Sequence, residues 1–311
     1  MNKTNLPIYS ALLCVSFLWG TSFAAAKIGM HELAPLNLVT LRFIIASAVF
    51  AGILLFMREN NTIDRGDIPR FFLLGFLAIT SYFYIQYTGL LYTTTIHAAL
   101  IIATSPLCAA LMGAVLGWER VSPIGAAGIL VAFAGVSLII TNGQLVGIFQ
   151  SQTLTGDFML LINAIVWAGF TLYGKTILKK YRPFVAMAYI HIFGTVMLLP
   201  FAFIASPLTP LSLSAQLPAI TWPTVVSALY LALLCSIYSY YVWYSGVEKI
   251  GAVRTAAFAY FNPLFAAVTG ILLLHEAATA LTAAGGVMVI AGVYLTNRSA
   301  AANQPSLEEK P

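Results

Sequence analysis

The sequence predicts an all-α integral membrane protein with ten transmembrane helices, arranged as two inverted five-helix repeats with both termini in the cytoplasm. The first observation is composition: 60% of the residues are hydrophobic and only 8% are charged, against roughly 25% charged in soluble domains. The second is a series of ten apolar runs, each close to the roughly 20 residues that cross a bilayer core. The third is that the second half of the chain repeats the first.

The apolar runs define the expected helices in order along the chain. Short polar segments separate them, including a cytoplasmic connector at 58–69. A longer external loop at 207–222 is rich in proline and serine, so we expect it to be irregular, with one interfacial turn. The membrane helices are expected near residues 8–26, 36–57, 70–91, 95–117, 123–141, 157–178, 184–206, 223–247, 252–274 and 278–296.

Matched residues define the repeat. A shift of 157 residues superimposes much of the first half on the second, and a shift of 148 aligns the earlier helices. A unit that crosses the bilayer five times ends on the opposite side, so its second copy inserts inverted, as is usual in secondary transporters. We expect repeats at 1–146 and 147–297 and a disordered cytoplasmic tail at 298–311. The matched pairs include Trp19 with Trp167, Lys27 with Lys175, Tyr87 with Tyr244, Pro106 with Pro263, and Glu119 with Glu276.

The positive charges predict the orientation. If the N-terminus is cytoplasmic, 13 of the 15 lysines and arginines fall on the inner side, and only Lys27 and Arg42 lie toward the outside. This distribution follows the positive-inside rule. It also accounts for the net charge of +5, so we expect no nucleic-acid partner.

Several catalytic and nucleotide-binding motifs are missing from the sequence, which excludes some classes of function. There is no GxxxxGK[ST] loop, so neither ATP hydrolysis nor an ATPase subunit is implied. No paired carboxylates, HExxH or Ser/His/Asp cluster stands at catalytic spacing, which argues against an enzyme. The cysteines lack metal-ligand spacing, so no metal site, cofactor or disulfide is expected. The expected partners are a small-molecule substrate and the lipid bilayer, and the chain is expected to be a monomer or a homodimer.

Aromatic residues in four helices are candidates for a substrate cavity. The first and sixth helices each carry a tryptophan near mid-membrane, and the third and eighth are rich in tyrosine. Tyrosine combines an apolar body with a hydroxyl group, which suits a wall facing an amphipathic solute. The alternatives are an interfacial belt for the tyrosines and core packing for the tryptophans. The substrate-binding candidates are Trp19, Tyr84, Tyr87, Trp167, Tyr238 and Tyr241.

Pro106 and Pro263 occupy matched positions in the fourth and ninth helices. Proline removes a backbone N–H and kinks a helix, and freed backbone at that depth is tolerated where it lines a cavity. We therefore place both helices against the substrate path, with the kinks as gating positions; a kink that only improves packing is the alternative. Ser105 and Asn262 directly precede the prolines and are candidate substrate ligands. Asn262 is preferred because its amide supplies donors and an acceptor.

Few ionisable residues lie at membrane depth. Arg42 lies about two turns inside the second helix, where it could bind an anionic part of the substrate, pair with a carboxylate, or extend outward and only anchor the helix. His97 and His191 lie near opposite faces; either could relay protons or serve only as a hydrogen-bonded packing residue. We expect Glu119 and Glu276 to stabilise the N-termini of the fifth and tenth helices.

No carboxylate is expected inside a helix, since Asp157 lies at a helix end. Proton coupling, if present, is therefore expected to use the histidines, and facilitated uniport is the alternative. Lys27 is expected to extend to the surface or flank the entrance. The glycine- and alanine-rich fifth and tenth helices are expected to pack closely, at the repeat interface or in a dimer seam.

Several motifs together carry a family resemblance. The first half contains Trp19-Gly20 with Phe23, Leu41-Arg42-Phe43, Pro106, Gly113, Glu119, Gly128 and Gly135. The second half contains Trp167, Pro263, Gly270, Glu276, Gly285 and Gly292. Over residues 8–296 this pattern resembles EamA-type members of the drug/metabolite transporter superfamily.

The resemblance implies a multi-pass carrier in the bacterial inner (plasma) membrane. We expect it to export small amphipathic metabolites, such as amino acids or related compounds, by alternating access. An uptake permease for a nucleoside-like or cofactor-like metabolite, or a multidrug exporter, is the alternative.

Overall fold

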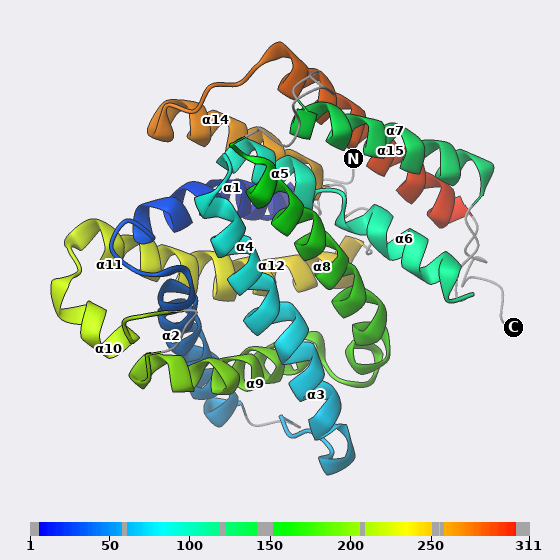
Figure 1. Cartoon of the computed structure of the whole chain (residues 1–311). Coiled ribbons are helices and arrows are strands. Elements are labelled where there is room, and N and C mark those ends of the chain that lie inside the picture. The colour runs from blue at the N-terminus through cyan, green and yellow to red at the C-terminus, as the bar shows by residue number, and fades with distance from the viewer. Residues whose placement is uncertain are drawn as a thin grey trace, which may run out of the picture.

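The computed structural model describes residues 6–57, 61–117, 122–141, 152–205, 209–250, 255 and 258–302. Helices account for all the regular elements of this described part, and short connections join them (Figure 1). They are α1 (Leu6–Gly29), α2 (Pro35–Phe56), α3 (Ile68–Gly75), α4 (Tyr82–Leu91), α5 (Thr95–Ile102), α6 (Ser105–Val115), α7 (Pro123–Thr141), α8 (Leu154–Lys180), α9 (Pro183–Phe203), α10 (Leu213–Gln216), α11 (Trp222–Leu229), α12 (Ser239–Ile250), α14 (Asn262–Leu274) and α15 (Ala280–Ala302).

Eight helical segments within the described residues are long and apolar enough to cross a bilayer. They agree with the first eight predicted segments to within a few residues at each end. Two shorter apolar helices follow, Ala259–Leu274 and Ala280–Thr296. The predicted ninth segment, 252–274, begins among residues that lie mostly outside the described part, so only its later portion is seen.

Two of the membrane segments contain π-helical turns. Phe76–Ser81 is π-helical and connects α3 to α4, and Tyr230–Tyr238 connects α11 to α12 in the same way. The 157-residue shift that matches Tyr87 with Tyr244 places 76–81 on 233–238, inside the second π segment. Such turns are rare and occur frequently at functional sites.

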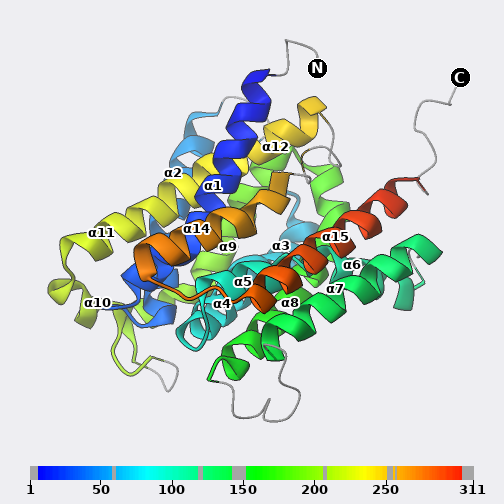
Figure 2. The same ribbon diagram turned by 90° about the horizontal axis from the view of Figure 1, so that it is seen from above.

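Helices from the two halves of the chain interleave. α1 packs against α11, α12 and α14, α2 packs against α9, and α4 packs against α8. Every one of these pairs joins a helix before residue 146 to one after it. α7 and α15 form a pair of their own and lie side by side at one edge of the molecule in both views (Figures 1 and 2).

The pairing of α7 with α15 depends on glycines, as the sequence predicts. A Cβ atom on Gly135 would lie 2.6 Å from the backbone oxygen of Gly285, and one on Gly128 would lie 2.7 Å from that of Gly292. Small residues of this kind let two helix backbones approach closely within a membrane. The described residues therefore place these glycines at a contact between helices, away from the molecular centre.

The connecting segments show one correction. α15 continues to Ala302, so the start of the predicted disordered tail, 298–302, is helical; residues 303–311 lie outside the described part. The external loop contains the short helix α10 and the 3-10 turn Leu217–Ala219. Asn37 on α2 holds this loop by donating to the carbonyl oxygen of Leu211 at 2.8 Å.

Candidate functional site

Arg42 lies at the centre of the molecule, and its side chain is only 3% exposed. Its Nε–H donates to the hydroxyl of Ser236 at 3.0 Å, and an Nη1–H donates to the hydroxyl of Tyr87 at 2.8 Å. The guanidinium also lies 4.3 Å from the ring centre of Phe83 and 5.0 Å from that of Phe43. Such contacts are attractive because aromatic faces carry partial negative charge. Arg42 therefore does not extend to the surface, which excludes the anchoring role considered for it.

A chain of aromatic rings runs past Arg42 and connects the two matched tryptophans. Successive ring centres lie 4.8–5.7 Å apart, which is the normal separation of packed aromatic pairs. We call this set, with the polar partners of Arg42, the central cluster. In order, the rings are Trp19, Tyr240, His191, Phe43, Phe83, Tyr82 and Trp167, and Arg42, Tyr87 and Ser236 complete it.

The π-helical segment Tyr230–Tyr238 supplies two polar groups to this cluster. The indole N–H of Trp19 donates to the carbonyl oxygen of Cys235 at 3.0 Å. Ser236 accepts from Arg42 and donates to the carbonyl oxygen of Leu231 at 3.0 Å, five residues earlier. The bond from Ser236 to a carbonyl five residues earlier lies within the π-helical segment, so the groups that this segment offers to the cluster stand on its wider turn.

The eighth helix requires a correction. Tyr241 is 60% exposed and Tyr238 is 38% exposed, both on the outer surface of the bundle, whereas Tyr240 is 8% exposed and belongs to the central cluster. Tyrosine occurs on every face of this helix, so periodicity alone does not select the buried one. Of the other aromatic candidates, Trp19, Tyr87 and Trp167 lie in the cluster, and Tyr84 is half-buried against the core.

Both prolines lie at local interruptions of a helical segment: Pro106 follows the break inside the span Thr95–Val115, and Pro263 follows the 3-10 turn Ala259–Phe261. α5 ends at Ile102 and α6 begins at Ser105, with the exposed Pro106 in its first turn. Ser105 donates to the carbonyl oxygen of Ile102 at 2.6 Å, so its hydroxyl is hydrogen-bonded to the end of α5, across the break between α5 and α6. Pro263 is buried in the first turn of α14.

Asn262 remains a candidate ligand in the ninth helix. Its side-chain oxygen is buried and has no hydrogen-bond partner among the described residues. Its backbone oxygen lies 2.6 Å from where a Cβ on Gly20 would stand, so α1 and α14 touch at this point. Because Gly20 follows Trp19, the amide lies beside the helix that carries one end of the aromatic chain.

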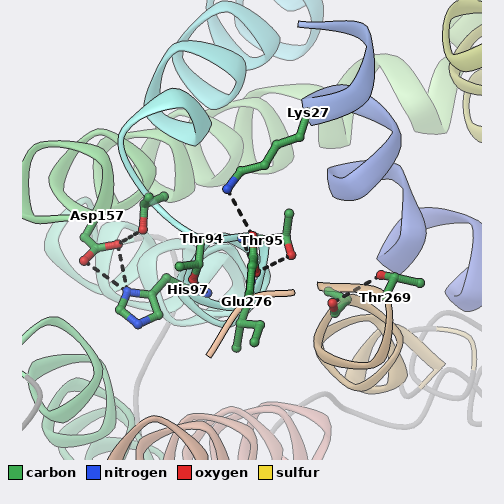
Figure 3. A network of polar contacts seen from close by, with 10 residues as sticks. Lys27, Thr94, Thr95, His97, Asp157, Thr269 and Glu276 are labelled. Carbon is green, nitrogen blue, oxygen red and sulfur yellow. Dashed lines mark hydrogen bonds and ion pairs between the residues drawn. The ribbon is translucent and has the colours of Figure 1, made fainter. Parts of the chain in front are cut away.

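A second polar group gathers at the predicted outer ends of the helices, and we call it the outer polar network. It consists of Lys27, Thr93, Thr95, His97, Asp157 and Glu276, and Figure 3 shows its two carboxylates on either side of the first turn of α5. Glu276 accepts the N–H of Thr95 at 2.8 Å, its hydroxyl at 2.7 Å and the ammonium of Lys27 at 3.0 Å.

Asp157 forms the other half of the outer polar network. Its side chain is fully buried in the first turn of α8, and it accepts the hydroxyl of Thr93 at 2.5 Å. Nδ1 of His97 lies 3.2 Å from the same carboxylate. Asp157 thus stands at a helix end, as expected, but it is shielded from solvent, which leaves a buried acid–histidine pair that the sequence did not predict.

These contacts correct the expected roles of Glu276 and Lys27. Glu276 binds the N-terminus of α5, where an anion is favoured by the helix dipole, instead of its own following helix. Burial opposes its ionisation, but the bonds from Thr95 and Lys27 outweigh this and hold the pKa of Glu276 below its ordinary value of 4.5. Lys27 is ion-paired and does not simply extend to the surface. Glu119, the residue matched with Glu276 in the first repeat, lies outside the described part.

The opposite ends of the helices carry a third polar group, the inner polar network. Lys180 at the end of α8 lies 2.6 Å from Asp67 and 2.5 Å from Asp64, and the hydroxyl of Tyr181 donates to Asp67 at 2.7 Å. Hydrogen bonds to Asp64 and Asp67 raise the pKa of Lys180 above its ordinary range. Together with the outer network, this fixes α8 at both of its ends.

His191 belongs to the central cluster and is fully buried. Its Nδ1 donates to the carbonyl oxygen of Met187 at 2.8 Å. Its Nε2 is buried and has no partner among the described residues. In this tautomer Nε2 is an acceptor, so His191 presents one unused acceptor beside the aromatic rings.

One open cavity lies elsewhere on the molecule. It has a volume of about 540 Å³, is almost entirely apolar, and is lined by α1, α11 and α14, including Phe17, Trp222 and Tyr230. No predicted substrate ligand lines it. None of the central-cluster residues lines it either.

The fold and the burial of polar groups define a class: a multi-pass helical membrane protein with a transporter's architecture. The chain matches the EamA-like transporter family over residues 6–141 and 154–298 and belongs to that family. It is accordingly a transporter and not an enzyme, which places it in a lipid bilayer with a small-molecule substrate.

Relatives agree with this assignment over nearly the whole chain. An uncharacterized transporter of Archaeoglobus fulgidus is 34% identical, covering 95% of this chain and 97% of its own. A probable amino-acid metabolite efflux pump of Salmonella typhimurium is 26% identical, covering 91% and 92%. A probable terminal-alkyne amino-acid exporter of Streptantibioticus cattleyicolor is 28% identical, covering 93% and 92%.

The fold also resembles a solved crystal structure. The TM-score is 0.61 at 17% identity, and the match covers 96% of this chain and 99% of the other. At this identity the likeness supports the fold alone.

Proposed function

We propose that the protein is a secondary carrier of the plasma membrane that exports small amphipathic metabolites, amino acids or related compounds, by alternating access. The observation that carries this proposal is the near full-length similarity to relatives named as amino-acid efflux pumps and exporters. The family matches the chain in two separate segments, 6–141 and 154–298, which supports two repeats near 1–146 and 147–297. We propose that these are inverted, with both termini cytoplasmic.

The central cluster is the proposed substrate site. Trp19, Arg42 and Tyr87 come from the first half, and Trp167, His191 and Tyr240 come from the second half. A site between inverted halves is exposed alternately to each side when one half moves against the other. Aromatic walls around a few polar groups suit an amphipathic solute.

The outer polar network supports a conformation closed on the outside. It connects α1, α5, α8 and the segment before α15 through the Lys27–Glu276 ion pair, the contact of His97 with Asp157, and hydrogen bonds. Opening to the outside would separate these elements, and the bonds would then be exchanged for water. Their modest net free energy, about 0.5–3 kcal/mol each, is compatible with a reversible closure.

Reconstitution into liposomes tests the carrier proposal. The folded protein is screened for counterflow of amino acids, nucleosides and cationic drugs, with and without a pH gradient. Counterflow of amino acids is the expected result. Counterflow confined to nucleosides or cationic drugs would favour the alternative cargoes instead, and a folded protein that moves none of these solutes would contradict the proposal.

A further inference from the structure

Arg42 differs from the buried or half-buried Lys27, Glu276 and Asp67 because its partners are neutral. Lys27 is paired with Glu276, and Asp67 is paired with Lys180 and Arg70. Arg42 donates only to the hydroxyls of Ser236 and Tyr87, and no salt bridge involves it among the described residues. Two of its five N–H groups are thereby used.

An unpaired charge at this position is expensive. Arg42 is seven residues into α2, or roughly 10 Å along the helix axis at a rise of about 1.5 Å per residue. Burying a charge without a counter-charge carries a large desolvation penalty, and charges at membrane depth commonly mark a substrate pathway. The rings of Phe43 and Phe83 offset part of the penalty without neutralising the charge.

The geometry of the guanidinium indicates which chemical group would pair with Arg42. Its planar fork binds carboxylates through two parallel hydrogen bonds. The hydroxyls of Ser236 and Tyr87 fix the orientation of this fork from two helices, one in each half of the chain. Nearby, the unused Nε2 acceptor of His191 can receive a hydrogen bond from a second group of the same solute.

We propose that Arg42 binds the carboxylate of the transported solute, so that the cargo is an amphipathic carboxylic acid that also carries a hydrogen-bond donor. This inference rests on the proposed carrier function and narrows its substrate class. The aromatic chain on either side of Arg42 accommodates the apolar part of the solute, and Ser236 and Tyr87 act as positioning residues.

Paired ligands test the assignment. L-Phenylalanine, L-leucine and L-threonine are each compared with their carboxamides, and apparent Kd is measured from thermal stabilisation of the purified full chain. The wild type is expected to bind at least one acid about tenfold or more tightly than its amide. Arg42→Gln is expected to lose about tenfold in acid affinity with the amide affinity nearly unchanged, so that the preference disappears.

Two further variants keep the result interpretable. Arg42→Lys retains the charge but not the fork, and is expected to weaken acid binding severalfold while keeping a preference for the acid; it also serves if Arg42→Gln fails to fold. Arg65→Gln removes an arginine that is exposed in the 3-10 turn before α3 and is expected to bind both ligands like the wild type.

The outcomes separate this inference from the carrier proposal. Equal binding of acids and amides by the wild type, or equal losses for both in Arg42→Gln, would overturn the assignment of Arg42 while leaving counterflow intact. Acid binding that depends on Arg42, without counterflow of any solute, would instead overturn the carrier proposal alone. A folded chain that neither binds nor moves any member of the panel overturns both.

Discussion

Glu276 and Thr95 meet across the outer end of the molecule: the Glu276 carboxylate accepts both the backbone N–H and the hydroxyl of Thr95, at 2.8 and 2.7 Å. Thr95 begins α5, and Glu276 lies in the connection between α14 and α15. One side chain therefore caps a helix from the other half of the chain and also binds Lys27 on α1.

Replacing Glu276 with glutamine should destabilise the protein. The amide keeps one acceptor oxygen but loses the charge that attracts Lys27 and the α5 terminus. We expect a loss of about 1–3 kcal/mol, seen as a lower melting temperature in detergent. Glu32→Gln is the comparison, since half-buried Glu32 accepts the N–H and hydroxyl of Thr221 at the start of α11 but pairs with no lysine among the described residues; an equal shift in both variants would argue against a special contribution of the Lys27–Glu276 pair.

The same carboxylate should make stability depend on pH. The pKa of Glu276 is lowered in the folded state below its ordinary value of 4.5. Its contribution is therefore fully present above the unfolded-state value and is lost as the pH falls through the folded-state value. Melting temperatures of the wild type and Glu276→Gln, measured from about pH 7 to about pH 3, should stay apart above the unfolded-state value of 4.5 and converge below it. A constant difference across this range would contradict the prediction.

Tyr240 and Tyr241 provide a matched pair for the central cluster. Tyr240→Ala should remove a buried ring between Trp19 and His191 and cost about 2–4 kcal/mol, with reduced counterflow. Tyr241→Ala removes an exposed ring and should change stability by less than about 0.5 kcal/mol. The reverse order of effects, in thermal melting and in counterflow, would mean that the helix is rotated from the orientation described.

A glycine pair tests the contact between α7 and α15. Gly135→Ala places a methyl group 2.6 Å from the Gly285 oxygen, and such overpacking typically costs about 1–3 kcal/mol. Gly52→Ala in α2 meets no atom within 4 Å and should be neutral or slightly stabilising, because alanine favours the helix over glycine. Melting temperatures of the two variants should therefore move apart, and equal values would be inconsistent with the close approach.

The sequence predicts where helices lie better than how they face each other. Apolar runs and charges locate the first eight spans because burial in a bilayer constrains composition along the whole segment. The matched tryptophans and Arg42 stand out in the sequence because residues of these types at mid-helix are unusual, and the structure places all three in the central cluster. The sequence favours Tyr241, whereas Tyr240 is the buried residue; a π-helical segment precedes both, and its wider turn shifts the face on which later residues lie.

The outer polar network shows a different difficulty. Glu276, Thr95, Lys27 and Asp157 are distant in sequence, and each is unremarkable at a helix end. The predicted orientation places all four residues at the outer face. Opposite charges at one membrane face could therefore have indicated that ion pairs form there. Which acid binds which partner depends on helix packing, which the sequence pattern does not specify.

The fixation of α8 has a consequence for the surrounding lipid. Asp157 and Lys180 are 23 residues apart on this helix, or roughly 35 Å at a rise of about 1.5 Å per residue, slightly more than the hydrocarbon thickness of a typical bilayer, about 30 Å. Because the first is bound to α5 and the second to Asp67 just before α3, α8 can tilt or slide independently only if these contacts break. A mismatched bilayer therefore either deforms around α8 or acts against these contacts, so bilayer thickness becomes a variable that acts on the whole protein.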